Sequence, residues 1–157
     1  MANYLEPCWG GKQKRHSPVR LNASTGSAGP LPIITTLFGD PISVVDVTIN
    51  TNGMSEPVVL LTFTGILNLP LGVSVTLNFE IMRSQDGGAP VSIGSTYTYA
   101  DVLDILASKS FAFQYFDNNL APGVYTYAVQ LSTNSIIDIT PGLTVSATLS
   151  ALAVDND

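Results

Sequence analysis

The side chains best suited to chemistry in this sequence lie close together near its start. Cys8, Trp9 and His16 are the only cysteine, tryptophan and histidine of the chain. A cysteine and a histidine can act as nucleophile and general base, but that pairing requires a positioned partner and a shielded pocket. The first 30 residues show no helical or strand period, and His16 directly follows the basic Arg15. We therefore expect no catalysis by these residues and predict that the protein is not an enzyme.

Acidic residues are the other candidates for a chemical role, as ligands of a calcium ion. They are Asp86, Asp101 with Asp104, and Asp155 with Asp157. None follows the alternating oxygen-ligand pattern of a calcium loop. Asp86 suits a turn, and Asp101 suits the cap of a short helix. The sequence also has no phosphate-binding loop, no glycine-rich dinucleotide turn and no zinc-type spacing. We expect neither a metal nor a cofactor.

Cys8 keeps two open roles. A lone cysteine beside a bulky aromatic residue can form a bond between two chains where the surroundings are oxidising. It can equally serve as a small apolar anchor, because a free cysteine packs like a hydrophobic residue.

Charge divides the chain into two unequal parts. Residues 1–30 carry four basic side chains and one acidic one, a net charge of +3. Residues 31–157 carry two basic and eleven acidic ones, a net charge of −9, which together give −6 for the whole chain. The basic residues of the first part are Lys12, Lys14, Arg15 and Arg20. Four charges without interleaved aromatic residues make a weak nucleic-acid motif, and the acidic remainder would repel phosphates. We predict no nucleic-acid partner.

Residues 1–30 are expected to form an extended N-terminal arm, followed by one domain over residues 31–157. The stretch SPVRLNASTGSAGPLP is rich in Ser, Gly, Ala and Pro, and its prolines favour extended backbone. No apolar run follows the first positive charges, so the sequence predicts no conventional signal peptide. No segment approaches the roughly 20 consecutive apolar residues of a membrane helix, so we expect no membrane insertion.

From about residue 33 onwards the pattern is that of β-strands. The stretch VSVTLNFEI alternates apolar and polar residues, and the Asp-Gly of SQDGGAP favours a hairpin. Only YADVLDILASKS has helical spacing. Eight or nine short strands separated by Gly- and Pro-rich turns predict an all-β fold, a jelly-roll sandwich of antiparallel strands. The expected strands cover residues 35–38, 42–50, 57–66, 73–83, 90–99, 110–117, 123–132, 135–139 and 143–154.

One expected strand is apolar on both faces. In PVVLLTFTGILNL the apolar residues do not alternate with polar ones at first, so both sides of the strand need a cover. One interpretation is a central strand that lies under a loop. The other is a subunit interface, which is favoured because charged residues make up only 11% of the chain, against roughly 25% in typical soluble domains. The predicted interface residues are Val58, Leu60, Leu61 and Phe63.

The last strands also resemble a known family. LAPGVYTYAVQLS followed by LTVSATLSALAV is similar to the end of the trimeric jelly roll of tumour-necrosis-factor and complement-type heads, found also in bacterial exosporium glycoproteins. GPLPIITT is similar to the Pro-rich leader of those glycoproteins, and a short chain of this design most resembles a fibre subunit of F-type endospore appendages. The resemblance covers roughly residues 30–154 and departs from the glycoproteins in lacking a Gly-X-Y stretch. It implies a structural protein of the spore surface.

The residues and the resemblance together predict a self-assembling fibre subunit on the surface of a bacterial endospore or cell, reached without a conventional signal peptide. An arm of net +3 and a body of net −9 attract each other, and an arm inserted into a neighbour is a head-to-tail contact that builds filaments. Expected partners are further copies, directly or as trimers, and other spore-surface proteins. The predicted connector residues are Cys8, Trp9, Lys12, Lys14, Arg15, His16 and Arg20.

Two other functions stay open. The first is a trimeric adhesion head that recognises carbohydrate or a host surface, with tyrosines that stack on sugars. The candidate tyrosines are Tyr97, Tyr99, Tyr115, Tyr125 and Tyr127, although alternation favours the core for the last two. The second is a viral capsid or decoration protein, because jelly rolls also build shells.

Overall fold

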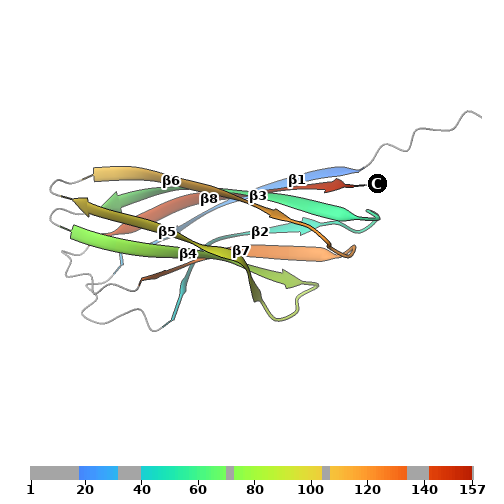
Figure 1. Ribbon diagram of the computed structural model, residues 1–157, viewed down its shortest axis with the longest axis horizontal. Helices are drawn as coiled ribbons and strands as arrows, with labels where there is room; N and C mark the ends of the chain where they lie inside the picture. Colours follow the sequence, from blue (N-terminus) through green and yellow to red (C-terminus); the bar gives the residue numbers. More distant parts are fainter. Residues whose placement is uncertain (1–17, 32–39, 70–72, 104–106, 134–141, 157) are drawn as a thin grey trace, which may run out of the picture.

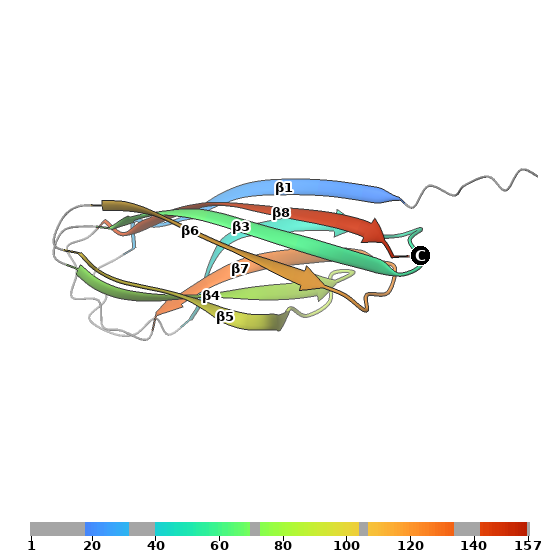
Figure 2. The same ribbon diagram turned by 45° about the horizontal axis from the view of Figure 1, so that its top comes forward.

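The protein is a sandwich of two four-stranded antiparallel sheets, seen in a computed structural model that describes residues 18–31, 40–69, 73–103, 107–133 and 142–156. One sheet has the strand order β1-β8-β3-β6 and the other β2-β7-β4-β5, which is the arrangement of a jelly roll (Figures 1 and 2). The prediction of an all-β jelly-roll sandwich is confirmed. The strands are β1 (Val19–Ala28), β2 (Ile42–Asn50), β3 (Pro57–Leu69), β4 (Val73–Gln85), β5 (Val91–Leu103), β6 (Ala107–Asp117), β7 (Val124–Thr133) and β8 (Thr144–Asp155).

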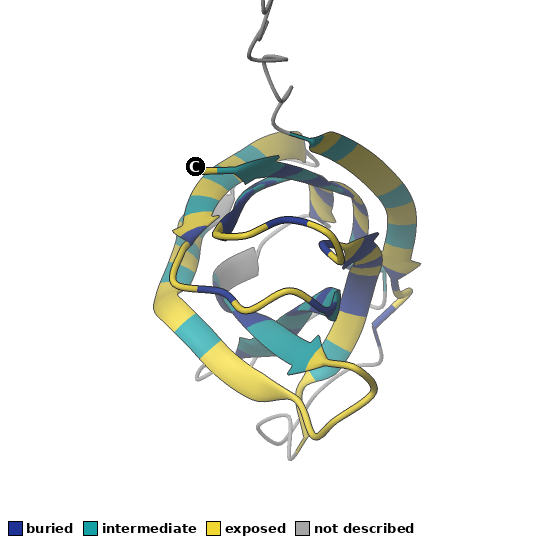
Figure 3. Cartoon of the chain, turned by 90° about the vertical axis from the view of Figure 1, so that its right-hand side faces the viewer, coloured by how far each residue is buried: buried dark blue, intermediate teal, exposed yellow. Residues whose placement is uncertain are grey.

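The core lies between the sheets because successive side chains of each strand point to opposite faces. In β7 every second residue is buried, and β8 follows the same alternation along most of its length. Viewed from one end, buried residues line the inside of both sheets (Figure 3). The core positions that alternation favours for Tyr125 and Tyr127 are confirmed, and the other inward residues of these two segments are buried as well: Val129, Leu131, Leu143, Val145, Ala147, Leu149, Ala151 and Ala153.

Part of the expected arm is a strand. Residues Val19–Ala28 form β1, which pairs with β8 from Val19 opposite Val154 to Ala28 opposite Val145. The strand has no alternating apolar pattern in the sequence, because its side facing β2 carries few apolar side chains. Its main chain approaches β2 so closely that a Cβ at Gly26 would collide with the Val44 carbonyl oxygen. The sandwich therefore begins at β1, and the remaining arm residues, 1–17, lie outside the described residues.

The expected helix in YADVLDILASKS is also wrong. Residues 99–103 belong to β5 and residues 107–110 to β6. Asp101 caps no helix; it accepts a hydrogen bond from the Tyr99 hydroxyl at 2.8 Å, and its carboxylate lies 3.8 Å from Lys109 Nζ. The strands expected at 135–139 and 35–38 both fall outside the described residues. Within the described ranges, the protein has no helix long and apolar enough to span a membrane.

Hydrogen bonds join the loops at the end of the sandwich where β1 begins, which we call the arm end. The expected Asp-Gly hairpin joins β4 to β5, with φ of 50° at Asp86 and 75° at Gly87, a conformation that glycine adopts without strain. Asp86 Oδ1 accepts from Val124 N at 2.8 Å, and Thr51 Oγ1 donates to the Gly123 carbonyl oxygen at 3.0 Å. The C-terminus and the start of β1 lie at this same end (Figure 1). The segment before β1 is therefore attached at an end of the sandwich where hydrogen bonds hold the loops together.

Candidate assembly surface

Strand β3 divides the predicted interface residues between two environments. Leu61 and Phe63 point inward, and both are buried in the core between the sheets. Val58 and Leu60 occupy the alternate positions and point away from the core, in register with Val154 and Leu152 of β8. The two apolar faces of this strand therefore lie in different surroundings. One faces the core, and the other belongs to the outer surface of the β1-β8-β3-β6 sheet.

Apolar residues of all four strands gather on that outer surface at its arm end. Leu21 lies opposite Leu152, Leu152 opposite Leu60, and Leu60 opposite Phe116, so one row crosses the whole sheet. The members on the two edge strands are strongly exposed, with 71% of Leu21, 64% of Val19 and 54% of Phe116 accessible, whereas Leu60, Leu152 and Val154 are half-buried and Val58 is buried, at 8%. We call this set the outer patch: Val19, Leu21, Val58, Leu60, Phe116, Leu152 and Val154.

The rest of the same surface carries small uncharged side chains. Beyond the outer patch, the outward positions of the four strands hold Ser, Thr, Ala, Asn and Gln, together with Ile66, which is 51% exposed. We call the whole outward side of this sheet the outer face. In the described strands it bears no charged side chain, since Arg20, Lys109 and Asp155 fall on the inward parity of their strands. Burying a surface of this kind costs less than burying a charged one, provided that its hydroxyl and amide groups find hydrogen-bond partners.

The charged connector residue that the structure describes acts within its own chain. Arg20 donates from Nη1 to the Asn50 carbonyl oxygen at 2.6 Å and from Nη2 to the Asn52 carbonyl oxygen at 2.8 Å. Asn22 donates from Nδ2 to the Thr48 carbonyl oxygen at 2.7 Å. These bonds satisfy main-chain acceptors of the edge strand β2 and of the turn that follows it, and they close the sandwich on this side. The other predicted connector residues, Cys8, Trp9, Lys12, Lys14, Arg15 and His16, lie outside the described residues.

Aromatic rings close the opposite side of the sandwich, between β5 and β6. The Tyr97 ring stacks on Phe113 with centroids 3.9 Å apart, and Phe113 stacks on Phe63 at 4.7 Å. Of the candidate sugar-binding tyrosines, Tyr97, Tyr99 and Tyr115 are half-buried in this cluster, whereas Tyr125 and Tyr127 are buried. Burial and the hydrogen bond to Asp101 raise the pKa of Tyr99 to about 12.

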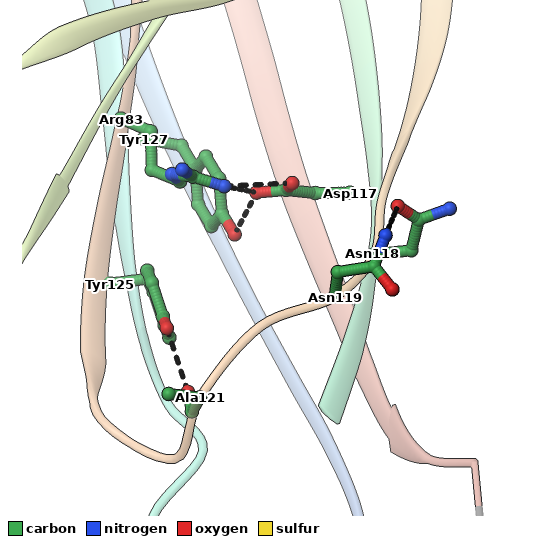
Figure 4. A network of polar contacts seen from close by, with 7 residues as sticks. All are labelled: Arg83, Asp117, Asn118, Asn119, Ala121, Tyr125 and Tyr127. Carbon is green, nitrogen blue, oxygen red and sulfur yellow. Dashed lines mark hydrogen bonds and ion pairs between the residues drawn. The ribbon is translucent and has the colours of Figure 1, made fainter. Parts of the chain in front are cut away.

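A polar network that sequence reasoning missed joins the two sheets in the interior. Arg83 of β4 donates to both carboxylate oxygens of Asp117 on β6, at 2.9 and 3.1 Å, and the Tyr127 hydroxyl of β7 donates to Asp117 Oδ2 at 2.8 Å (Figure 4). Asp117 is only 3% exposed. Burial raises the pKa of Tyr127, and the neighbouring Asp117 raises it further. A signal was present, since Arg83 and Asp117 each continue an inward apolar series, with opposite charge.

The described residues contain no cluster of metal-ligating side chains. No group of three or more His, Cys, Asp or Glu side chains there is placed to hold a metal ion. Asp155 instead accepts from the main-chain nitrogens of Ser55 and Glu56, at 2.9 and 2.8 Å. A hollow of about 250 Å³ lies beside this contact and is lined by Glu56, Pro57, Val58, Asn119, Leu120 and Asn156, of which Glu56 is the charged one. A shallower hollow of about 290 Å³ lies on the outer face and is lined by Thr25, Gly26, Thr64, Ile66, Ser146, Ala147 and Thr148.

Comparison with known families shows to which family the sequence belongs. Residues 17–154 match a family described as a domain of unknown function, DUF4489. The chain belongs to the DUF4489 family. The match begins just before β1 and ends within β8, so this DUF4489 domain is the whole described sandwich. No curated protein matches the sequence.

Solved structures share the fold of this DUF4489 chain at low identity. A chain of infectious bursal disease virus, Gx strain, is 12% identical with a TM-score of 0.53, over 87% of this chain and 32% of the viral one. The Gt strain gives 10% identity and a TM-score of 0.45, over 90% and 38%. A xylan-binding domain of Paenibacillus barcinonensis is 13% identical with a TM-score of 0.34, over 85% and 94%. The DUF4489 chain spans about a third of the viral chains. The likeness to the Gx chain supports a jelly-roll-like sandwich and no more.

Proposed function

We propose that this DUF4489 protein is a self-assembling structural subunit of a fibre on the surface of a bacterial endospore or cell. The observation that carries the proposal is the outer face, an entire sheet surface without a charge and with an exposed apolar patch. Contiguous apolar patches of this kind on soluble domains are typical of interaction sites. The low share of charged residues agrees, because 11% of the chain against roughly 25% in typical soluble domains leaves more of the surface without charge.

The N-terminal arm supplies the lengthwise contact in this proposal. Residues 1–17 carry Lys12, Lys14 and Arg15 against Glu6, a net charge of +2, and the part after residue 30 is strongly acidic. Seventeen extended residues reach about 55–60 Å, more than the ~40 Å of a twelve-residue strand. An arm can therefore cross a neighbouring domain. Contacts that run from one subunit into the next and do not close build filaments.

Substitutions in the arm of the full-length chain test this function. Trp9 is the proposed anchor, because buried tryptophan often dominates binding energy. Trp9→Ala should shorten fibres in negative-stain micrographs far more than Lys14→Ala, since an exposed charge pair contributes only about 0–1 kcal/mol. Equal fibre lengths for the two variants would contradict the anchor, and fibres as long as those of the unaltered chain in both would contradict insertion of the arm.

A carbohydrate-binding head is the second candidate, supported by the half-buried rings at the β5–β6 edge. Tyr97, Tyr99 and Tyr115 lie together there. Tyr97 stacks on Phe113 and Tyr99 meets the edge of Phe111 with centroids 5.8 Å apart, and the Tyr97 hydroxyl donates to the Gln114 carbonyl oxygen at 3.2 Å. Selective binding of one glycan class on an array, lost in Tyr97→Ala, would favour this function over the fibre.

A further inference from the structure

The outer face differs from the rest of the surface in what it can take as a partner. The basic arm is attracted to carboxylates, and none of these is an outward residue of the described strands of the β1-β8-β3-β6 sheet, although Glu56, just before β3, lines a hollow together with Val58. Another copy of the body is acidic, so most of its surface repels this one. Two outer faces bring no like charges together. Charge therefore favours the arm as the partner of the acidic surfaces. It favours the outer face of a second copy as the partner of the outer face.

The size of the face also suits a second copy. Four strands about 4.8 Å apart and ten residues long at ~3.3 Å per residue cover roughly 600 Å². Stable interfaces bury about 800 ± 200 Å² per partner, so nearly the whole face must take part. Two sheets that pack face to face keep their strands within about 30° of each other, which allows this overlap.

The position of the outer patch selects one of two symmetric arrangements. The patch lies at the arm end of the face and not at its centre, as the pairing of Val19 with Val154 shows. A two-fold axis across the strands would lay the patch of one copy on the Ser- and Thr-rich end of the other. A two-fold axis along the strands lays patch on patch while the faces overlap fully. The second arrangement buries apolar surface against apolar surface.

The same axis places a protruding side chain of one copy over a hollow on the outer face of the other. It runs between β8 and β3, so β3 of one copy faces β8 of the other at the same height. Ile66, which is in register with Ser146 within its own sheet, then faces the partner's Ser146. Ser146 lines the hollow on the outer face, whose other lining residues are small apart from Ile66 itself. Half-exposed Ile66 therefore lies over the part of the partner's hollow formed by Ser146, beside the partner's own Ile66, and Leu60 meets the partner's Leu152.

We propose that two copies of this protein pack outer face to outer face about a two-fold axis along the strands, so that both arms leave from the same end. This inference rests on the proposed function and adds the lateral contact, a pair of subunits that both point one way along the fibre. The pair carries two parallel arms, and a fibre built from it is polar.

A charge-swap experiment on the full-length chain tests both the face and the axis. Leu60→Lys and Leu152→Glu are outward substitutions that leave the core intact, which circular dichroism checks. Each variant alone should weaken pairing about tenfold or more in sedimentation velocity, because each copy buries a charge without a partner. Mixing the two variants should restore pairing. Ser92→Glu, on the outward side of β5, is the matched control and should leave pairing unchanged.

The outcomes separate the alternatives. Pairing of Leu60→Lys as strong as in the unaltered chain overturns the outer-face contact. Loss in both variants without restoration in the mixture overturns the axis along the strands. If the arm covers the face instead, the emission of the single Trp9 shifts to longer wavelength in a Leu60→Lys protein whose association is unchanged, and the proposal is wrong. Fibres that persist in Leu60→Lys would overturn this inference and leave the proposed function standing, whereas a chain that never assembles overturns the function itself.

Discussion

Removal of the Asp117 carboxylate should destabilise the sandwich strongly, because three strands meet at this group. Asp117→Ala leaves the Tyr127 hydroxyl, on a side chain that is 0% exposed, without its acceptor. An unsatisfied buried hydroxyl costs about 1–3 kcal/mol. Arg83 also loses its partner, but 29% of its side chain is exposed, so water replaces part of that interaction. We expect a loss of about 3 kcal/mol, at the low end of the roughly 3–5 kcal/mol for breaking a buried ion pair.

Urea unfolding followed by circular dichroism measures this loss, and thermal unfolding should show a midpoint about 6–12 °C lower. The experiment is repeated at several protein concentrations, since assembly raises apparent stability. Tyr127→Phe is the matched variant and should cost about 1 kcal/mol, because it removes one hydrogen bond and leaves the ion pair. In that background Asp117→Ala should cost less than it does alone. A loss below about 1 kcal/mol, or strict additivity of the two changes, would refute the network as the link between the sheets.

Two further predictions concern pH and the β1–β2 contact. Burial raises the pKa of Tyr127 in the folded protein, so the folded state keeps a proton that the unfolded state releases above about pH 10. This group should leave the unfolding free energy unchanged below that pH and lower it above that pH by up to about 1.4 kcal/mol per pH unit, and the raised pKa values of Tyr97, Tyr99 and Tyr125 add to the fall. Urea titrations at pH 8 and 11 check this pH dependence, and an unchanged midpoint would contradict it. Gly26→Ala should lower the free energy of unfolding by about 1–3 kcal/mol, because its Cβ would meet the Val44 carbonyl oxygen and lie 2.9 Å from Val45 Cα. The exposed neighbour Ser27→Ala should change stability by less than about 0.5 kcal/mol, and a similar loss in both variants would count against the close approach.

Most of the fold could be predicted because alternation is strong in the strands that face the core. β7 and β8 were located to within a residue or two, and their inward residues are the buried ones. β1 was missed because it is an edge strand whose β2-facing side carries Arg20, Asn22, Ser24 and Gly26 in place of an apolar series. Its contacts are hydrogen bonds and main-chain packing, which leave no hydrophobic period in the sequence.

The helix predicted between Tyr99 and Ser110 failed for a different reason. Helical spacing of apolar residues arose there by chance, where one strand ends and the next begins, and a twelve-residue stretch is too short to separate the two periods. The sequence showed that β3 is apolar on both of its faces. Which of them faced outward depended on the pairing with β8 and β6, and so did the row from Leu21 to Phe116. Contacts between strands so distant in sequence are set by topology, which no local pattern contains.

Analytical ultracentrifugation of the purified, unaltered chain over a wide concentration range tests the central claim most directly. We predict that the sedimentation coefficient rises with concentration, through a subunit pair to long assemblies that negative-stain microscopy shows as fibres. A single species with the mass of one subunit at the highest concentration, with no fibres on the grid, would contradict the account.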